Sequence, residues 1–199
     1  MKNFLIGVAA LVASGLCWSQ PTTAVKQEFV VKPIAEKKLK QLPAGELYWR
    51  VENSPTLAQA QAAAGETALA VEVAGKVWLF TLGAKGGSTP GASKVVEVGP
   101  VPLITASEYL LRINNSGGPP GSKTPVHTHP GSEAFYVLTG RLGQKTPHGV
   151  SHVEAGKTMN GHGADMPMEV FSSGTSDLNA LVMFVVDASR PFSSPATMP

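Results

Sequence analysis

Two histidines and a glutamate lie close together in the C-terminal half of the sequence, at His127, His129 and Glu133. Residues two apart on a β-strand project from the same face, so both imidazoles are expected to point the same way. The Pro-Gly-Ser sequence at 130–132 is typical of a turn, and Glu133 then starts the next strand at the same end. Two imidazoles and a carboxylate that meet at one point can bind a transition metal and leave coordination positions open to water, oxygen or a substrate. The spacing therefore predicts a metal site.

The segment around these residues resembles the first motif of the cupin superfamily. That motif consists of Gly, five residues, His-x-His, three or four residues, Glu, six residues and Gly, and each fixed position has a match. The matching residues are Gly121, His127, His129, Glu133 and Gly140. The resemblance implies a single-domain cupin β-barrel, the double-stranded β-helix or jelly roll, around one divalent transition metal. It also implies dioxygenase or isomerase chemistry on a small organic molecule, with Glu133 able to detach from the metal and act as the catalytic base.

A second cupin motif follows the first in that family and usually supplies a His as the fourth ligand. The corresponding stretch here begins at Gly156 and has Pro167 where the family commonly has a Pro just before that His. The next residue is Met168, and Phe171 replaces an Asn that usually follows. The resemblance therefore covers the first motif fully and departs from the second at the fourth ligand.

Three interpretations of this departure stay open. Met168 is a ligand through its thioether, which favours copper, especially Cu(I), over hard ions. Alternatively His162 completes a set of three His and one Glu, which suits iron or manganese. In the third interpretation there is no fourth protein ligand and Met168 packs in the barrel core, as most methionines do. Three functions follow from these interpretations: a small metalloenzyme, a non-catalytic periplasmic cupin that binds a metal or ligand, and a structural cupin without turnover whose barrel serves assembly.

The first residues are typical of a secretory signal. Lys2 gives a short positive start, residues 4–16 carry no charge, and Cys17 and Ser19 occupy the −3 and −1 positions of a cut before Gln20. The apolar run is shorter than the ~20 residues of a membrane-spanning helix. Leu16 argues against lipidation of Cys17, because a lipoprotein signal needs a small residue there. We therefore expect an exported protein, periplasmic or secreted, whose mature form has no cysteine.

Composition narrows the class of partner. The 199 residues are 43% hydrophobic and 15% charged with a formal net charge of +2, which suits one globular domain. So few charges form no basic stripe, so we expect no nucleic-acid partner. Outside the signal no segment is apolar enough for the membrane, and a small molecule is the expected ligand. Cupin barrels often dimerise through added β-strands, so the resemblance also allows a homodimer that uses residues before Gly65.

The elements that must position the site are short strands. Their even spacing and intervening turn residues predict an all-β barrel or sandwich. The candidate strands are 28–32, 67–72, 76–82, 94–98, 107–113, 133–139, 150–154, 169–171 and 179–186. One short helix is expected in the N-terminal extension, with Ser54 as N-cap, Pro55 at the first position and Gly65 past the end. The predicted division is a signal peptide (1–19), an N-terminal arm (20–44), a cupin domain (45–190) with its motif region at 106–188, and a peripheral C-terminal tail (191–199).

Overall fold

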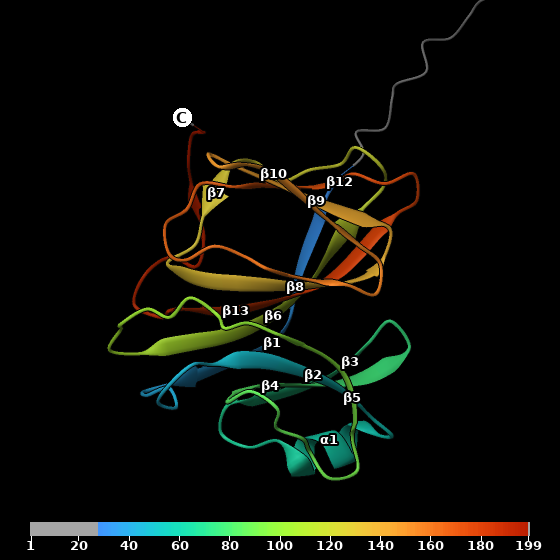
Figure 1. The fold of residues 1–199 in the computed structure, drawn as a ribbon, viewed down its shortest axis with the longest axis vertical. Helices are drawn as coiled ribbons and strands as arrows, with labels where there is room; N and C mark the ends of the chain where they lie inside the picture. The colour runs from blue at the N-terminus through green and yellow to red at the C-terminus, as the bar shows by residue number, and fades with distance from the viewer. Residues whose placement is uncertain (1–27, 199) are drawn as a thin grey trace, which may run out of the picture.

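The computed structural model describes residues 28–198, so the predicted signal peptide lies outside the described part. Within this range the chain forms fourteen β-strands and one short helix (Figure 1), which confirms the prediction of an all-β fold. The N-terminal elements are β1 (Val30–Leu39), β2 (Tyr48–Ser54), α1 (Leu57–Ala63), β3 (Ala68–Val73), β4 (Lys76–Gly83) and β5 (Ser93–Val98). The C-terminal elements are β6 (Tyr109–Gly118), β7 (His127–Thr128), β8 (Gly131–Thr139), β9 (Arg141–Thr146), β10 (Gly149–Glu154), β11 (Thr158–Asn160), β12 (Glu169–Ser172), β13 (Leu178–Asp187) and β14 (Ser194–Pro195).

The strands from β6 to β13 form a jelly roll. One sheet has the order β1-β6-β13-β8-β11, in which β1 is added at the edge beside β6. The facing sheet has the order β10-β9-β12, and backbone bridges from His127 to Met168 and from Lys123 to Phe171 join the β7 side of the roll to it. With β1 included, the two facing sheets hold eight antiparallel strands, which is the arrangement of jelly-roll and cupin domains.

The five-stranded sheet β1-β6-β13-β8-β11 is the central sheet of the molecule. It is buried on both faces, and the sequence of β13 shows why. Along β13, Val182 and Phe184 point into the roll, while Met183 and Val185 point to the opposite core. A strand covered on both faces is apolar at every position instead of at alternate ones. This accounts for the nearly continuous apolar run of β13, all of whose residues from Ala180 to Val186 are buried.

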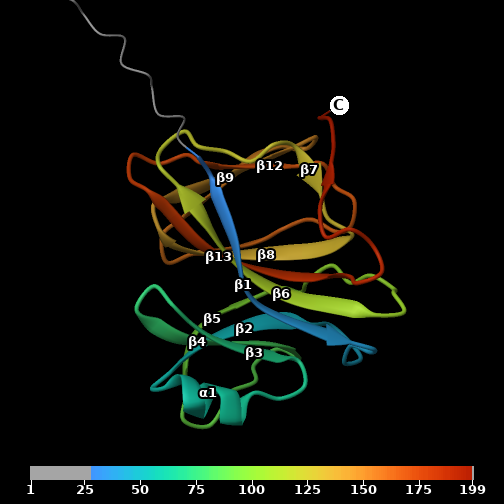
Figure 2. The ribbon, with the colours of Figure 1, turned by 180° about the vertical axis from the view of Figure 1, so that it is seen from behind.

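A third sheet, which we call the N-terminal sheet, packs on the face of the central sheet that points away from the roll (Figure 2). It has the order β3-β4-β2-β5 and is built from residues of the N-terminal half. Trp49, Trp78 and Phe80 of this sheet are buried in the same hydrophobic cluster as Leu111 and Met183 of the central sheet. The molecule therefore has three layers of sheet, and the central one contributes to both cores.

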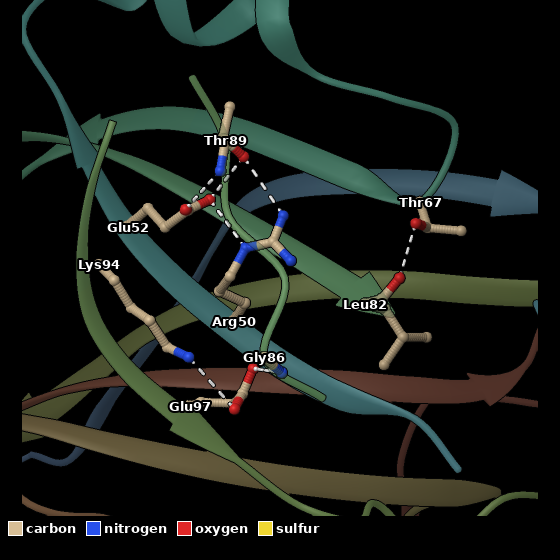
Figure 3. A network of polar contacts seen from close by, with 8 residues as sticks. All are labelled: Arg50, Glu52, Thr67, Leu82, Gly86, Thr89, Lys94 and Glu97. Carbon is tan, nitrogen blue, oxygen red and sulfur yellow. Dashed lines mark hydrogen bonds and ion pairs between the residues drawn. The ribbon is translucent and has the colours of Figure 1, made fainter. Parts of the chain in front are cut away.

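The far face of the N-terminal sheet carries a buried ion pair (Figure 3). Arg50 and Glu52 alternate with the core residues of β2, so they point to the other side, toward the loop after β4. The Nε of Arg50 lies 3.0 Å from Glu52 Oε2, and Thr89 donates to Glu52 through its amide (2.9 Å) and its hydroxyl (2.7 Å). Burial alone would raise the pKa of Glu52, but the Thr89 hydrogen bonds and the Arg50 guanidinium together lower it below 4.5.

Several local predictions need correction. The helix is capped by Thr56, whose side chain accepts from the Gln59 amide, and Ser54 instead ends β2. The strand predicted to end at residue 113 continues as β6 as far as Gly118. The prediction also missed β2, β9, β11 and β14. No helix of residues 28–198 has the length and hydropathy needed to cross a membrane.

Candidate functional site

The jelly roll encloses a cavity of about 390 Å³ between its two sheets. Most of its wall is apolar, and the apolar lining residues are Phe29, Val31, Pro125, Val126, Phe135, Leu142, Val170, Val182, Phe184, Phe192 and Pro195. His127, His129 and Glu133 also line this cavity, so the fold brings the three sequence-predicted side chains to one space. Gly121 and Gly140, the fixed glycines of the motif, have φ angles of 82° and 73°, a conformation that glycine adopts readily.

Both imidazoles are fixed through Nδ1. In His127, Nδ1 lies 2.9 Å from the Pro125 carbonyl oxygen, and in His129 it lies 2.7 Å from the Phe192 carbonyl oxygen. A carbonyl oxygen only accepts, so each Nδ1 carries the proton and each Nε2 keeps its lone pair. The ring centroids are 4.9 Å apart with the planes at 82°. Histidines that bind metals usually have this outer hydrogen bond, which sets the tautomer and the ring direction.

Burial keeps the His129 ring neutral at ordinary pH. The ring packs edge-on against Phe184 and beside Phe192, with centroids 4.9 and 4.7 Å away. Burial lowers the pKa of His129 to about 4, and the Phe192 carbonyl opposes this shift only in part. A neutral imidazole is the form that binds a metal ion.

Glu133 is a buried carboxyl group at the start of β8. It is 3% exposed, and its Oε1 accepts a hydrogen bond from Gln144 Nε2 at 2.5 Å. Burial raises the pKa of Glu133 to about 8, and the Gln144 hydrogen bond lowers it only partly. Gly161 lies close behind, since a Cβ there would be 2.6 Å from Glu133 Cγ. The carboxyl group is therefore held tightly from the side of β9 and the loop at residue 161.

Met168 lies next to this carboxyl group but outside the cavity lining. Its backbone pairs with that of His127 through two hydrogen bonds of 2.9 Å. The side chain is 1% exposed, and Gln144 Nε2 is 3.4 Å from its sulfur. Gln144 thus contacts both Glu133 and Met168, and sequence reasoning did not single it out.

The structure places His162 beside His148, with ring centroids 6.2 Å apart, and His162 does not line the cavity. Burial, and to a smaller extent His148, lower the pKa of His162. His152 contacts Ser173, with Nδ1 to Oγ at 3.0 Å. These three histidines are thus separate from the pair at 127 and 129.

The imidazoles of His127 and His129 and the carboxyl group of Glu133 are groups that bind transition metals, and each Nδ1 is held by a carbonyl as in metal-binding histidines. The three side chains are not close enough together to form a ligand cluster. Among residues 28–198, no three His, Cys, Asp or Glu side chains lie together as a metal-binding group. Two imidazoles, each held at Nδ1 by a backbone carbonyl, and one carboxyl group nevertheless line the same cavity. Side chains would therefore have to move before all three could bind one metal ion. In that movement Glu133 would give up the hydrogen bond that it accepts from Gln144.

The C-terminal segment completes the cavity wall, in contrast to its predicted peripheral position. β14 pairs with β7 opposite His127 and Thr128, and the Ala196 amide donates to the Val126 carbonyl at 3.1 Å. The Phe192 ring contacts the rings of both His129 and Phe184, with centroids 4.7 and 4.9 Å away. Because its carbonyl also accepts from His129, this segment both covers the cavity and orients one histidine. The short Pro-rich sequence gave no sign of this role.

A polar row on β6 also escaped the sequence analysis. Arg112, Asn114 and Ser116 alternate along the strand and all line the cavity. Arg112 donates through Nε to Asn114 Oδ1 at 2.8 Å, and its guanidinium lies 3.9 Å from the centroid of the Phe192 ring. The alternation was visible in the sequence, but the prediction ended the strand at residue 113, before the pattern was complete.

Comparison with protein-family models gives no match, and comparison with curated proteins gives none either. Among solved structures, the chain is similar to the DMSP lyase DddQ from Ruegeria pomeroyi, with 21% identity, a TM-score of 0.38, and coverage of 43% of this chain and 43% of the lyase. It is also similar to a cupin superfamily protein from Desulfitobacterium hafniense (12% identity, TM-score 0.35, coverage 39% and 68%). A third is the polyketide cyclase RemF from Streptomyces resistomycificus (20% identity, TM-score 0.37, coverage 45% and 62%). The chain thus spans less than half of the lyase and under two thirds of the cyclase.

The strand order and the positions of the motif residues define this chain as a cupin-fold protein. The two sheets of the jelly roll have the expected order, and β7 and β8 place the first-motif residues against the cavity between them. The similarities to solved structures are too low for any argument about activity, so the site itself must supply one.

Proposed function

We propose that this chain is an exported cupin that binds one divalent transition metal through His127, His129 and Glu133 and acts on a small organic molecule. The observation that supports this most is the pair of imidazoles, each fixed through Nδ1 to a backbone carbonyl, beside a buried carboxyl group. Three protein ligands leave coordination positions open for a substrate. In this proposal Met168 is a packing residue and supplies no ligand.

A bound metal would supply Lewis-acid activation of a substrate oxygen. The chain's own residues do the rest. The apolar wall excludes water and holds the body of the substrate, and the Phe192 carbonyl keeps the His129 ring in place. Among residues 28–198, Glu133 is the one carboxyl group that lines the cavity, so it is the candidate acid–base residue. Burial raises its pKa to about 8, so it would accept a proton from the substrate only after a bound cation has ionised it.

A non-catalytic metal- or ligand-binding cupin is the second candidate. The contact between Gln144 and Glu133 favours it, because that hydrogen bond already engages the carboxyl oxygen that a base would use. A substrate-turnover screen on metal-loaded protein separates the two functions. Turnover that Glu133→Gln abolishes supports the enzyme, and tight binding without turnover supports the carrier or sensor.

Metal titration followed by native mass spectrometry tests the proposed site. Wild-type protein should bind one copper, iron or manganese ion per chain, and the double variant His127→Ala/His129→Ala should bind none while it keeps its far-UV circular dichroism. The matched control is His148→Ala/His162→Ala, which removes the other histidine pair and should keep full occupancy. Full occupancy in the first variant would refute the assignment.

Export is part of the same proposal and has its own test. N-terminal sequencing of the protein from the exported fraction should find Gln20 as the first residue. An intact Met1 on protein from the cytosolic fraction would contradict it, and so would a lipid on Cys17.

A further inference from the structure

We infer that Arg112 and Asn114 form the anchor for a carboxylate group, and that the ligand of this cavity is a small carboxylic acid with an apolar body. The inference deepens the proposed function, since it names the class of molecule that the cavity takes. It depends on that function only in assuming that the cavity binds a small molecule. It does not depend on the metal.

The position of the two side chains follows from β6. Residues two apart on a strand share a face, and on this strand the faces have different chemistry. Leu111 and Ile113 are buried in the core between the central sheet and the N-terminal sheet. Arg112 and Asn114 point to the other side and line the cavity. Polar side chains at these positions would be costly in a wall made only for packing.

Both side chains keep donors for a ligand. Arg112 uses Nε on Asn114 Oδ1 (2.8 Å) and Nη1 on Glu36 Oε1 (3.1 Å), and no described residue accepts from Nη2. Because Asn114 Oδ1 accepts from Arg112, its amide nitrogen is the end left to donate. Asn114 is 1% exposed to solvent and lines the cavity. An amide N–H on a cavity-lining side chain can donate to an acceptor group of a ligand there.

The guanidinium of Arg112 lies over the Phe192 ring, with 3.9 Å from Cζ to the ring centroid. A guanidinium can bind a carboxylate in a two-point manner through neighbouring N–H groups. The C-terminal segment therefore contacts the anchor as well as His129.

Charge favours an anion. Within residues 28–198, Arg112 is the one Lys or Arg that lines the cavity. Its ion-pair partner Glu36 lies outside that lining, and the Glu36 side chain is 48% exposed, so solvent screens the pair strongly. The rest of the wall is mainly aliphatic and aromatic, which suits an apolar ligand body. At about 390 Å³ the cavity lies at the small end of the ~300–1,000 Å³ range of ligand pockets.

Calorimetry on metal-free protein tests the anchor. The probes are matched acids and amides, namely benzoate and benzamide, phenylacetate and phenylacetamide, and hexanoate and hexanamide. Wild type should bind at least one carboxylate about tenfold or more tighter than its amide, since a charge-assisted hydrogen bond is roughly twice as strong as a neutral one. Arg112→Gln should abolish this preference and leave amide binding within about twofold. Arg112→Lys, which keeps the charge and loses the fork, should retain only part of it.

Arg141→Gln is the control, because this partly exposed arginine on β9 pairs with Glu154 and does not line the cavity. It should bind like the wild type. Two results would overturn the inference. One is that wild type binds no carboxylate of the panel more tightly than its amide, and the other is that Arg112→Gln keeps the preference. Circular dichroism of each variant excludes unfolding as a cause. Because the calorimetry uses metal-free protein, a negative result would not affect the conclusion about the metal site. In the same way, a negative metal titration would not affect the conclusion about the carboxylate anchor.

Discussion

The side chains of the candidate site are held by backbone carbonyls and by one amide. His127 and His129 each donate from Nδ1 to a carbonyl, and Gln144 holds Glu133 while it contacts the sulfur of Met168. Met168, the residue that departs from the second cupin motif, contacts Gln144 and does not line the cavity. Whether the site has a fourth protein ligand therefore depends on whether the sulfur of Met168 can bind the metal.

Met168→Leu distinguishes a ligand from a packing residue. Leu has nearly the same volume and lacks the sulfur lone pair. We expect unchanged affinity for copper and a loss of under ~1.5 kcal/mol in the free energy of unfolding, as for other near-isosteric core substitutions. Competitive metal titration and chemical denaturation at one pH give the two values. A clear loss of copper affinity would show that the thioether is a ligand after all.

The pairing of β14 with β7 determines how the cavity is closed, and the sequence was least informative about this part of the fold. The first motif allowed His127, His129 and Glu133 to be identified, because its spacing matches the strand–turn–strand geometry at one end of a roll. The part played by residues 191–198 could not be predicted, since β14 has two residues and depends on a backbone pairing with β7 that has no sequence pattern. The polar row that begins at Arg112 and Asn114 was missed because the predicted strand ended at residue 113, whereas β6 still pairs with β1 and β13 beyond that point.

Removing the C-terminal segment should weaken metal binding. A chain that ends at Arg190 loses the Phe192 carbonyl that holds His129, and outer hydrogen bonds of this kind are typically worth about 10–100-fold in metal affinity. A chain that ends at Ala196 keeps Phe192 and β14 and is the control. Metal affinity of both is measured by competition with a chelator. Equal affinities would show that the segment does not orient the histidine.

The helix start gives a second prediction at this scale. Thr56 caps α1 with a hydrogen bond of 3.2 Å to the Gln59 amide, whereas Ser54 belongs to β2. Thr56→Ala should therefore lower the free energy of unfolding by about 1 kcal/mol. Ser54→Ala should stay within about 0.5 kcal/mol of wild type. The opposite order in urea denaturation would restore Ser54 as the cap.

In the whole molecule, two cores share the central sheet, so a buried group far from the cavity affects the stability of the entire chain. The Arg50–Glu52 pair is such a group (Figure 3). The pKa of Glu52 is lowered in the folded state, so its ionised form stabilises the fold above pH 4.5. This contribution should be lost as the pH falls below 4.5 and through the lowered pKa, because the unfolded chain takes up the proton first.

Glu52→Gln should accordingly be less stable than wild type by about 1.5–3 kcal/mol at neutral pH, the value of a hydrogen bond to a charged group. The difference should narrow as the pH falls below 4.5. Glu72→Gln, an exposed change on β3, should match wild type at each pH. Urea denaturation followed by the fluorescence of Trp49 and Trp78 gives these values, and a difference that does not change with pH would contradict the assignment.

The central claim is that His127, His129 and Glu133 bind one metal inside the jelly roll. Anomalous diffraction from crystals of metal-loaded protein tests it most directly. We predict a single peak in the cavity, about 2.0–2.2 Å from Nε2 of both histidines and from a carboxylate oxygen of Glu133, as is usual for such ligands. Glu133 should then have exchanged its contact with Gln144. A peak at His148 and His162 instead, or an empty cavity in crystals soaked with excess metal, would contradict the account.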